Sequence, residues 1–380
     1  MVKNSKIKRL AACLLAAAML TGCGSGEAEN AAATGTDPAL EAGVDDQAVS
    51  GEATSVDAQA GEGTTDADDP IAGLDYNNSE EWKKIREQAR KQGFMLSEIT
   101  MLTTEYVNLK HQFSKKVGNT YWQSSDPSVV RVGKNKTRIF AKKPGEAMIE
   151  GRSEDGSFHS FCKVTVKRKP KNIIYLTFDD GPSRYSTPKI LDILKRNAVH
   201  ATFFELKPAR DDYDLTQRVI DEGHTLAIHG YSHKYDQIYS SDVAYYKNLK
   251  KLQRLFYRRF GQWCTQTRFP GGSSNTVSRH YSVGIMSRLV KKVHRWGFLY
   301  QDWNVSSGDA GGSNTADEVF KMVTSGIQKG RSNVILMHDF SGNDKTINAL
   351  QRIIDWGKQH NFVFRAMTPS TVEIHHGVNN

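Results

Sequence analysis

Acidic and histidine side chains between residues 179 and 233 have types and spacings suited to metal-assisted hydrolysis. Asp179 and Asp180 are adjacent, and His229 and His233 are four residues apart. Two crowded carboxylates repel each other, and a bound cation relieves the repulsion, so that one carboxylate serves as a ligand and the other as a base. Together with Asp180, the two imidazoles offer two nitrogens and one oxygen with room for water, which is the arrangement of a catalytic zinc site.

Each of these motifs is weak when it stands alone. Asp179-Asp180-Gly181 also fits a simple turn between a strand and a helix. Consecutive residues of a strand point to opposite faces, so both carboxylates reach one site only if the strand ends here. In a chain with 12 histidines, most pairs spaced like His229 and His233 are ordinary surface or core residues. The interpretation therefore depends on the elements that position these side chains.

From Asn172 onward, strand-like and helix-like segments alternate, which predicts an α/β domain with a parallel sheet, open or closed into a barrel. The expected strands are Ile173–Phe178, Ala201–Leu206, Thr225–His229, Thr267–Phe269, Phe298–Val305, Asn333–Met337 and Phe362–Met367. The expected helices are Thr187–Arg196, Leu215–Glu222, Asp242–Phe260, Ser278–Trp296, Ala316–Lys329 and Lys345–His360.

Reactive side chains gather near the carboxyl ends of five of these strands, the end at which α/β barrels build their active sites. They are Asp179, Asp180, His229, His233, Arg268, Asp309 and His338. A cluster drawn from five strands is a much stronger indication of a site than any one of its members.

Six segments, in this order, resemble the motifs of a known enzyme family. They are Thr177–Ser183, Ala201–Phe204, Gly223-His224 with His229–His233, Arg268–Gly271, Trp303–Asp309 and Ile335–His338. On these motifs, residues 171–370 are identified as a member of the polysaccharide deacetylases, the NodB-homology domain of carbohydrate esterase family four. The resemblance implies a distorted (β/α) barrel, a divalent metal and hydrolysis of N- or O-acetyl groups on glycans.

The resemblance also implies a role for each matching residue. Asp180, His229 and His233 match the metal ligands, Asp179 matches the general base that deprotonates the attacking water, and His338 matches the general acid. The metal is expected to be zinc, although cobalt, nickel and manganese tolerate similar nitrogen and oxygen ligands.

Further roles follow from the same resemblance. Arg268 matches the residue that orients the base, the backbone N–H of Gly271 would help to hold the oxyanion, and Ile335 matches the acyl pocket. Asp309 occupies the slot that supports the catalytic residues. Asp302-Trp303 fits that motif in another register, but the Asp309 alignment needs no gap.

Four residues depart from the pattern of the family. Gly230 stands in the Ser/Thr slot after the first metal histidine, Gly271 in a Tyr slot, and Ser306 and Ala310 in the Asp and Trp slots of the fourth motif. None of the four is an expected metal ligand. Gly271 and Ala310 each lack a ring, so we expect a wider substrate groove.

A smaller module precedes the α/β domain. Residues 79–96 contain an expected short helix, Ser79–Gly93, with Ser79 as its cap. Residues 97–168 hold short strand-like runs separated by turn residues, and Trp122–Val132, Ala141–Ile149 and Val164–Val166 resemble the bacterial immunoglobulin-like group 2 domain. The resemblance implies an all-β sandwich that acts as a spacer or binds glycans or partners, and a spacer is our first expectation.

The N-terminus resembles a bacterial lipoprotein signal. Residues 1–22 combine basic residues with an apolar stretch, and Leu20–Cys23 resembles a lipobox, which implies lipidation of Cys23 and an exported protein held at the outer face of the cell membrane. A simple secretory signal is the alternative. Residues 23–78 carry thirteen acidic residues and no Lys or Arg, which predicts a disordered tether.

Charge and length limit the remaining possibilities. No apolar run of the 380-residue chain reaches the roughly 18–20 residues of a membrane span, which argues against an integral channel or transporter. Removing the first 78 residues from the totals leaves 47 basic and 29 acidic residues, a net charge of +18 for residues 79–380. This charge suits an anionic wall polymer or lipid, and export makes nucleic acid an unexpected partner.

Two cysteines remain for the folded part after the signal and the lipidation site are set aside. Cys162 and Cys264 fall in different expected domains. An interdomain disulfide is conceivable outside the cytosol, but we expect two buried apolar thiols.

These observations together predict a membrane-anchored, metal-dependent hydrolase of carbon–nitrogen bonds, with residues 371–380 as a C-terminal tail. The expected substrate is the acetamido group of N-acetylglucosamine in peptidoglycan. Poly-N-acetylglucosamine, chitooligosaccharide and O-acetylated xylan remain alternatives, and an inactive wall- or glycan-binding lipoprotein is the alternative of another class. No obligate protein partner is expected.

Overall fold

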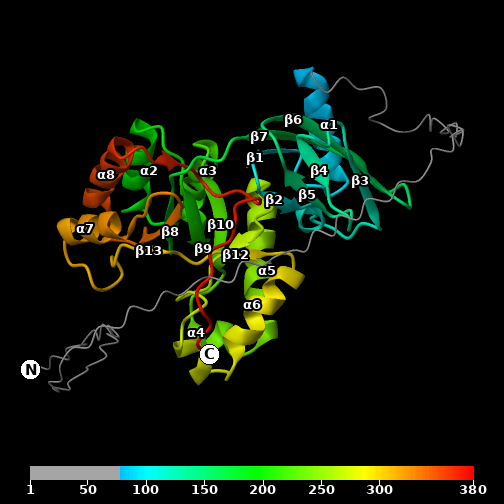
Figure 1. Cartoon of the computed structure of the whole chain (residues 1–380). Coiled ribbons are helices and arrows are strands. Elements are labelled where there is room, and N and C mark those ends of the chain that lie inside the picture. Colours follow the sequence, from blue (N-terminus) through cyan, green and yellow to red (C-terminus); the bar gives the residue numbers. More distant parts are fainter. Residues whose placement is uncertain (1–77) are drawn as a thin grey trace, which may run out of the picture. The chain divides into compact units, whose positions relative to one another are not determined.

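The computed structural model describes residues 78–380 (Figure 1). The expected signal peptide, the lipidation site Cys23 and the acidic tether lie outside the described residues. Among the residues that are described, no helix has both the length and the apolar composition that a membrane span requires.

Helix α1 (Ser79–Lys91) begins at the expected residue, but its cap lies one residue earlier than expected. Asn78, and not Ser79, is the N-cap, because its side-chain oxygen accepts hydrogen bonds from the backbone N–H groups of Glu80 and Glu81. Trp82 and Ile85 on the buried face of the helix pack in one apolar cluster with Phe161. The helix is therefore attached to the strand module that follows it.

Two small sheets form the module after α1. One has the strand order β1-β7-β6-β3 and the other β2-β5-β4, and a shared apolar core that includes Trp122, Ile139 and Val164 lies between them. The strands are β1 (Glu98–Leu102), β2 (Tyr106–Asn108), β3 (Thr120–Ser124), β4 (Val130–Val132), β5 (Arg138–Ala141), β6 (Gly145–Ser153) and β7 (His159–Lys167). The assignment of this module to the bacterial immunoglobulin-like group stays a prediction.

A curled parallel sheet forms the centre of the α/β domain. Its strand order is β12-β11-β10-β9-β8-β14-β13, and β15 pairs with the beginning of β8. The strands are β8 (Ile173–Asp179), β9 (Thr202–Leu206), β10 (Thr225–Gly230), β11 (Gln266–Thr267), β12 (Leu299–Tyr300), β13 (Val305–Ser306), β14 (Ser332–His338) and β15 (Val363–Phe364).

The expected single strand Phe298–Val305 is wrong, because this segment forms two strands at opposite edges of the sheet. Strand β12 pairs with β11, whereas β13 pairs with β14. Only residues 301–304 separate the two strands along the chain, so the sheet curls until its edges approach each other. The sheet is a curled parallel half-barrel that stays open at this segment.

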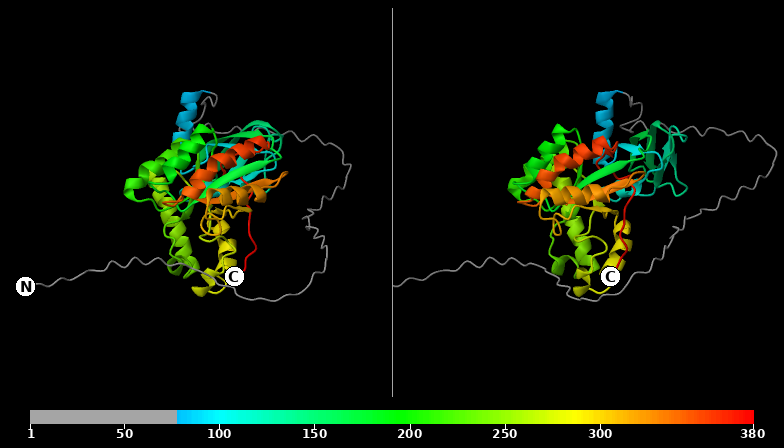
Figure 2. Two further views of the ribbon diagram at one scale, coloured as in Figure 1. Left: turned by 90° about the vertical axis from the view of Figure 1, so that its left-hand side faces the viewer. Right: turned by 60° about the vertical axis from the view of Figure 1, so that its left-hand side comes forward.

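Helices cover the outer face of the sheet (Figures 1 and 2). The helices of the domain are α2 (Thr187–Arg196), α3 (Tyr213–Asp221), α4 (Tyr235–Ile238), α5 (Asp242–Phe260), α6 (Ile285–Arg295), α7 (Ala316–Gly326) and α8 (Asp344–Gln359). The short α4 lies away from the sheet and packs against α5. Helices α2 and α5 have the bounds expected from the sequence. The expected helix Ser278–Trp296 is instead divided at Gly284 into a short 3-10 turn and α6.

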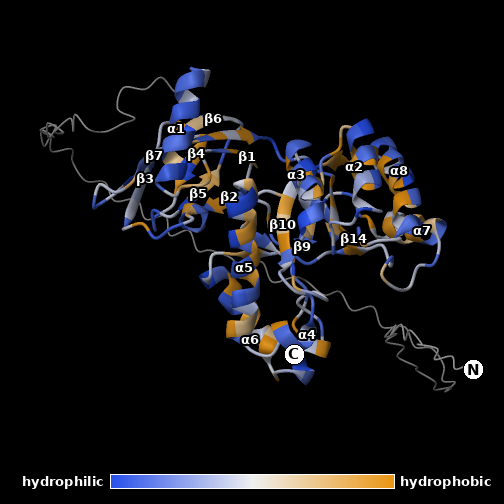
Figure 3. Ribbon diagram, turned by 180° about the vertical axis from the view of Figure 1, so that it is seen from behind, coloured by the Kyte–Doolittle hydropathy of each residue, from blue (hydrophilic) through white to orange (hydrophobic). Residues whose placement is uncertain are grey.

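Alternation along β8 separates a helix-facing core from the barrel interior. Ile174, Leu176 and Phe178 pack with apolar residues of α2, α7 and α8, whereas Ile173 and Tyr175 belong to a second cluster inside the barrel. Figure 3 shows the hydrophobic colouring of β10 and the mixed colouring of α5 beside it. Because Asp179 has the same parity as Ile173 and Tyr175, its carboxylate faces the interior.

Both free cysteines are buried within the described part of the chain. Cys162 lies in β7 and Cys264 just before β11, and neither forms a disulfide. Burial raises the pKa of each thiol. The expectation of two buried apolar thiols is confirmed.

Candidate active site

The end of β8 turns two adjacent carboxylates toward one place. Asp179 is the last residue of the strand, and Asp180 adopts φ = 74°, a left-handed conformation that Asp tolerates better than most residues. The strand therefore stops between the two residues. This removes the alternation that would otherwise place the carboxylates on opposite faces.

Asp180, His229 and His233 form a candidate metal site. The Oδ1 atom of Asp180 lies 3.4 Å from Nε2 of His229 and 3.6 Å from Nε2 of His233. This oxygen is buried and has no hydrogen-bond partner. Nδ1 of His229 lies 3.1 Å from the carbonyl oxygen of Arg268, so a proton on Nδ1 leaves Nε2 free to act as a ligand.

This donor set fits a divalent transition metal. Two imidazole nitrogens and one carboxylate oxygen are common zinc ligands, and three protein ligands leave a position open for water or substrate. The buried Oδ1 of Asp180 has no hydrogen-bond partner among the described residues, and a bound ion would be its partner.

Arg268 holds the second carboxylate from inside the barrel. Its side chain is fully buried, and Nη1 donates hydrogen bonds of 2.8 Å to Oδ1 of Asp179 and to Oγ1 of Thr177. Its other nitrogens donate to the carbonyl oxygens of Gln301 and Asp302. Because all three guanidinium nitrogens have partners, the arginine is rigid and keeps Asp179 in one orientation.

His338 and Asp309 form a buried ion pair beside Asp179, at the end of the neighbouring strand β14. Strands β14 and β8 pair with His338 opposite Asp179, and Nδ1 of His338 lies 2.8 Å from Oδ1 of Asp309. Burial would lower the pKa of His338, but hydrogen bonding and charge attraction to Asp309 raise it to about 9. The Nε2 atom of a protonated His338 is then available to donate a proton.

The other contacts of Asp309 keep this carboxylate charged. Burial would raise the pKa of Asp309, but hydrogen bonds from His338, Thr346 and Asn343 lower it to about 2. Both carboxylate oxygens accept more than one hydrogen bond, including one from Oγ of Ser307. The arrangement combines a candidate metal-ligand set, a carboxylate held by arginine and an imidazole held by aspartate.

Comparison with known proteins identifies the domain that carries this arrangement. A family model described as "Polysaccharide deacetylase" matches residues 166–284. Over 212 residues, the chain is 30% identical to the YheN protein of Bacillus subtilis, whose name assigns it to the polysaccharide deacetylases; the alignment covers 53% of this chain and 69% of that protein. The chain belongs to the polysaccharide deacetylase family. It is therefore a hydrolase of carbon–nitrogen bonds other than peptide bonds.

Two further similarities involve named deacetylases of peptidoglycan. The chain is 30% identical over 208 residues to a peptidoglycan-N-acetylglucosamine deacetylase of Bacillus cereus, covering 52% of this chain and 70% of the relative. It is also similar to the crystal structure of the catalytic domain of peptidoglycan N-acetylglucosamine deacetylase from Eubacterium rectale. That similarity has 43% identity and a TM-score of 0.53, and it covers 56% of this chain and 96% of the other.

The two possible registers of the fourth motif have different places in this deacetylase. Asp309 contacts His338, whereas Asp302 is buried beneath the loop that carries Gly271, where its Oδ1 accepts a hydrogen bond from the backbone N–H of Ser273. Asp302 therefore supports the loop and not the imidazole of His338.

A tyrosine from another position occupies the space beside Gly271. A Cβ atom added to Gly271 would overlap the hydroxyl oxygen of Tyr235, which follows the metal-ligand motif and stacks edge-on against His233. Burial raises the pKa of Tyr235 to about 12, so its hydroxyl stays neutral. The expectation that the missing ring at Gly271 widens the groove is wrong at this point, because Tyr235 takes up the space.

Trp303, from the same motif as Ala310, supplies aromatic surface to the loop that carries Gly271 and Gly272. Ala310 is exposed, whereas the indole of Trp303 contacts the position where a Cβ of Gly272 would lie and stands 5.8 Å from the guanidinium of Arg268. Trp303 was part of the quoted motif, but nothing in the sequence indicated this contact.

Ile335 does not lie where the sequence comparison placed it. The side chain packs in the helix-facing core with residues of α2, α7 and α8. His338 is three residues further along β14, so the two side chains point to opposite faces of the sheet. The prediction of Ile335 as an acyl-pocket residue is therefore wrong, because alternation along the strand turns it away from the site.

Asp339 is a supporting residue that the sequence analysis missed. Its backbone N–H donates to the carbonyl oxygen of Asp179, and its carboxylate accepts a hydrogen bond from Oγ1 of Thr187. Burial raises the pKa of Asp339 to about 7. A Cβ atom on Gly181 would overlap both carboxylate oxygens, so Asp339 lies directly beneath the turn that follows Asp180. The only sequence signal was its position after His338.

Proposed function

We propose that this protein is a divalent-metal-dependent N-deacetylase that hydrolyses the acetamido group of N-acetylglucosamine in peptidoglycan. The observation that supports this most strongly is the meeting of Asp179, Asp180, His229, His233 and His338 at one end of the barrel. We propose zinc as the ion, because the ligand set is two imidazoles and one carboxylate.

Each side chain then has one task in the reaction. Asp180, His229 and His233 would hold a divalent cation, which would supply Lewis-acid chemistry for the acetyl carbonyl and the attacking water. Asp179 takes the proton of the attacking water, and Arg268 keeps the carboxylate of Asp179 oriented. By the family resemblance, we assign the backbone N–H of Gly271 to the oxygen on which negative charge develops.

The leaving amine requires a proton when the carbon–nitrogen bond breaks. His338 donates that proton from Nε2, because its Nδ1 is bound to Asp309. The water oxygen becomes part of acetate, and the amine nitrogen remains on the sugar. Asp179 thus acts as the base and His338 as the acid.

Two observations support peptidoglycan as the polymer. Two of the compared proteins are named as deacetylases of peptidoglycan N-acetylglucosamine. The net charge of +18 over residues 79–380 also suits an anionic cell-wall environment.

We further propose that the protein works at the extracytoplasmic face of the cell membrane, anchored by a lipid on Cys23. This proposal rests on the sequence of residues 1–23, which lie outside the described part of the chain. The acidic segment that follows would serve as a tether between the anchor and the folded domains.

Acetate release tests the proposed activity. The protein is incubated with zinc and either purified peptidoglycan or chitooligosaccharides, and the Asp179→Asn variant serves as the blank. Release from peptidoglycan is expected. Release only from oligosaccharides would overturn the proposed polymer, and a metal-loaded protein that releases no acetate from a wider panel of acetylated glycans would overturn the enzyme in favour of a glycan-binding protein.

A further inference from the structure

A second group of metal-type ligands lies outside the active site. His294 is near the end of α6, and Glu373 and His375 belong to the C-terminal segment after β15. Nε2 of His294 lies 2.9 Å from Oε1 of Glu373, and Nε2 of His375 lies 3.4 Å from the same oxygen. One ligand atom from each of the three residues lies within 4.8 Å of the other two.

The donor set repeats that of the active site. Each group has two imidazole nitrogens and one carboxylate oxygen, and the corresponding nitrogen–oxygen distances around Asp180 are 3.4 and 3.6 Å. Ligand atoms about 2.0–2.1 Å from a tetrahedral ion are separated from one another by about 3.3–3.4 Å. The atoms around Glu373 thus require only small shifts to hold an ion between them.

Hydrogen bonds already orient the histidines. The ring of His294 also hydrogen-bonds to the backbone carbonyl of Val290, which leaves Nε2 as the atom facing Glu373. The ring of His375 stacks on Tyr300 with centroids 3.8 Å apart, and its Nε2 lies 3.2 Å from the carbonyl oxygen of Tyr300. The Nε2 atoms of His294 and His375 both face oxygen atoms. Because lone pairs on nitrogen and oxygen repel each other, a proton or a cation must lie between each Nε2 and the oxygen.

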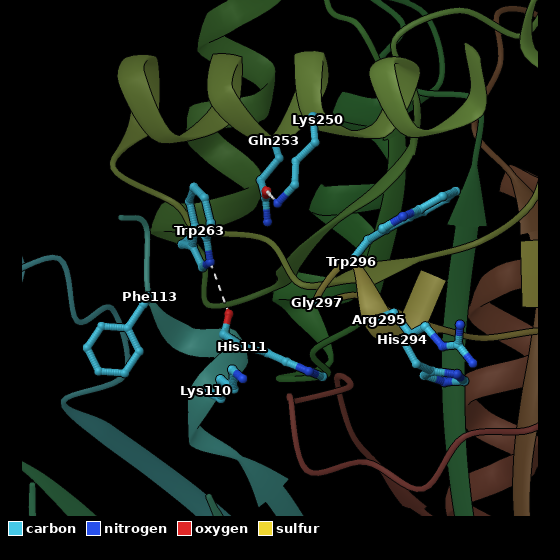
Figure 4. Close-up of a pocket in the computed structure, with 10 residues that line it drawn as sticks. All are labelled: Lys110, His111, Phe113, Lys250, Gln253, Trp263, His294, Arg295, Trp296 and Gly297. Carbon is cyan, nitrogen blue, oxygen red and sulfur yellow. Dashed lines mark hydrogen bonds between the residues drawn. The ribbon is translucent and has the colours of Figure 1, made fainter. Parts of the chain in front are cut away.

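Solvent can reach this group, which gives an ion a path to it. The side chains of His294, Glu373 and His375 are 38%, 13% and 35% exposed. Figure 4 shows His294 among the residues that line a cavity of about 440 Å³, together with His111 and Lys250. The active site has an additional carboxylate, Asp179, which attracts a cation. Near His294 lies the cationic side chain of Arg138, which repels one. The group around Glu373 should therefore bind a cation more weakly than the active site does.

We propose that His294, Glu373 and His375 form a second site for a divalent transition metal such as zinc, distinct from the catalytic site. The site is structural, because it joins the C-terminal segment to α6 and β12. It is independent of the proposed reaction, since none of its ligands lies in the active site.

The segment fastened in this way supports the loop that carries Gly271. Between the two tail ligands, the carbonyl oxygen of Ile374 accepts a hydrogen bond from the N–H of Asp302. His376, the residue after the ligand His375, donates its backbone N–H to Oδ2 of Asp302, whose Oδ1 accepts a hydrogen bond from the N–H of Ser273. A metal at the second site would therefore stabilise the tail, and through Asp302 the loop beside the active site.

Zinc stoichiometry tests the proposal without measuring activity. The full chain is dialysed against buffers of defined free zinc, and bound zinc is measured by elemental analysis. We expect about two zinc ions per chain for the wild type and about one for Glu373→Gln. The glutamine oxygen can keep the hydrogen bond from the N–H of Tyr300, so this variant should fold. His294→Gln is the second variant, and exposed His280→Gln is the matched control that should keep both ions.

The double variant His229→Gln/His233→Gln isolates the second site. In this protein, zinc should still bind and should slow hydrogen exchange of the amides of Asp302 and His376. Glu373→Gln added to this double variant should abolish both effects. The proposal would be overturned if the wild type bound only one ion, and if that ion were lost from the double variant but kept by Glu373→Gln. It would also be overturned if Glu373→Gln and His294→Gln each still bound two ions.

Discussion

Asp309 accepts two hydrogen bonds from His338, one from Nδ1 of the imidazole and one from the backbone N–H, each 2.8 Å long. The backbone bond fixes the position of the carboxylate relative to β14, and the side-chain bond fixes the ring. The imidazole that faces the active site is thus both oriented and kept protonated by one aspartate.

Asp309→Asn should move the alkaline limb of the pH–rate profile to lower pH. Hydrogen bonding and charge from Asp309 overcome the effect of burial and raise the pKa of His338 to about 9. Without that charge, burial lowers the pKa, and the proposed acid loses its proton at a lower pH. The measurement is kcat for acetate release against pH for both proteins. An unchanged alkaline limb would show that His338 is not the group titrating there.

The same pair should contribute to stability within a defined pH window. The pKa of Asp309 is lowered from 3.8 to about 2, and that of His338 is raised from 6.5 to about 9. The contribution is full between pH 3.8 and 6.5, and it is lost as the pH rises through 9 or falls through 2. Urea unfolding should therefore show a larger difference between wild type and Asp309→Asn at pH 5.5 than at pH 10. Equal differences at the two pH values would contradict this.

Asp179→Asn should lose turnover and keep the metal. General base catalysis typically contributes about 10²–10⁴-fold, so a fall in kcat of at least about 100-fold is expected. Zinc content should not change, because the proposed ligand oxygen belongs to Asp180. The matched control is Asp236→Asn, an exposed aspartate in α4, which should keep its activity. Loss of zinc from Asp179→Asn would make Asp179 a ligand.

Gly181→Ala should destabilise the turn between the proposed ligand Asp180 and the following helix. The added methyl group would overlap the buried carboxylate of Asp339, and overpacking of this kind costs about 1–3 kcal/mol. A lower free energy of unfolding and weaker zinc binding are expected. Gly311→Ala is the control, because a Cβ there has no heavy atom within 4 Å. If both variants were equally stable, Asp339 could not lie against the turn as described.

Tyr235→Ala should raise KM for glycan more than Tyr235→Phe does. The phenol fills the space beside Gly271, and phenylalanine keeps most of that shape. Truncation of Tyr235 should widen the site near His233, a proposed metal ligand, whereas the exposed Tyr106→Ala in the strand module should have no effect. Steady-state kinetics on one chitooligosaccharide series would measure this, and identical KM values for all three variants would refute the packing role.

Several parts of the fold follow from local sequence alone. Helix α5 has its expected bounds because Ser241 caps its beginning and Gly261 takes a left-handed conformation at its end. The buried strands β8, β9, β10 and β14 were recognisable as short apolar runs between turn residues. In contrast, β12 and β13 were read as one strand, because the assignment of neighbouring residues to opposite sheet edges depends on pairing partners far away in the chain.

The sequence by itself determined the types and order of the reactive residues, since the motifs from Thr177 to His338 carry the family resemblance. It also determined where most strands end, and so which side chains could meet. Tertiary structure decided which of them do meet: Asp309 and not Asp302 reaches His338, and Tyr235 covers Gly271. It also brought His294 to Glu373, 79 residues away. Such contacts depend on how the sheet curls and where the C-terminal segment packs. Local residue preferences encode neither of these, because both depend on residues far apart in the chain.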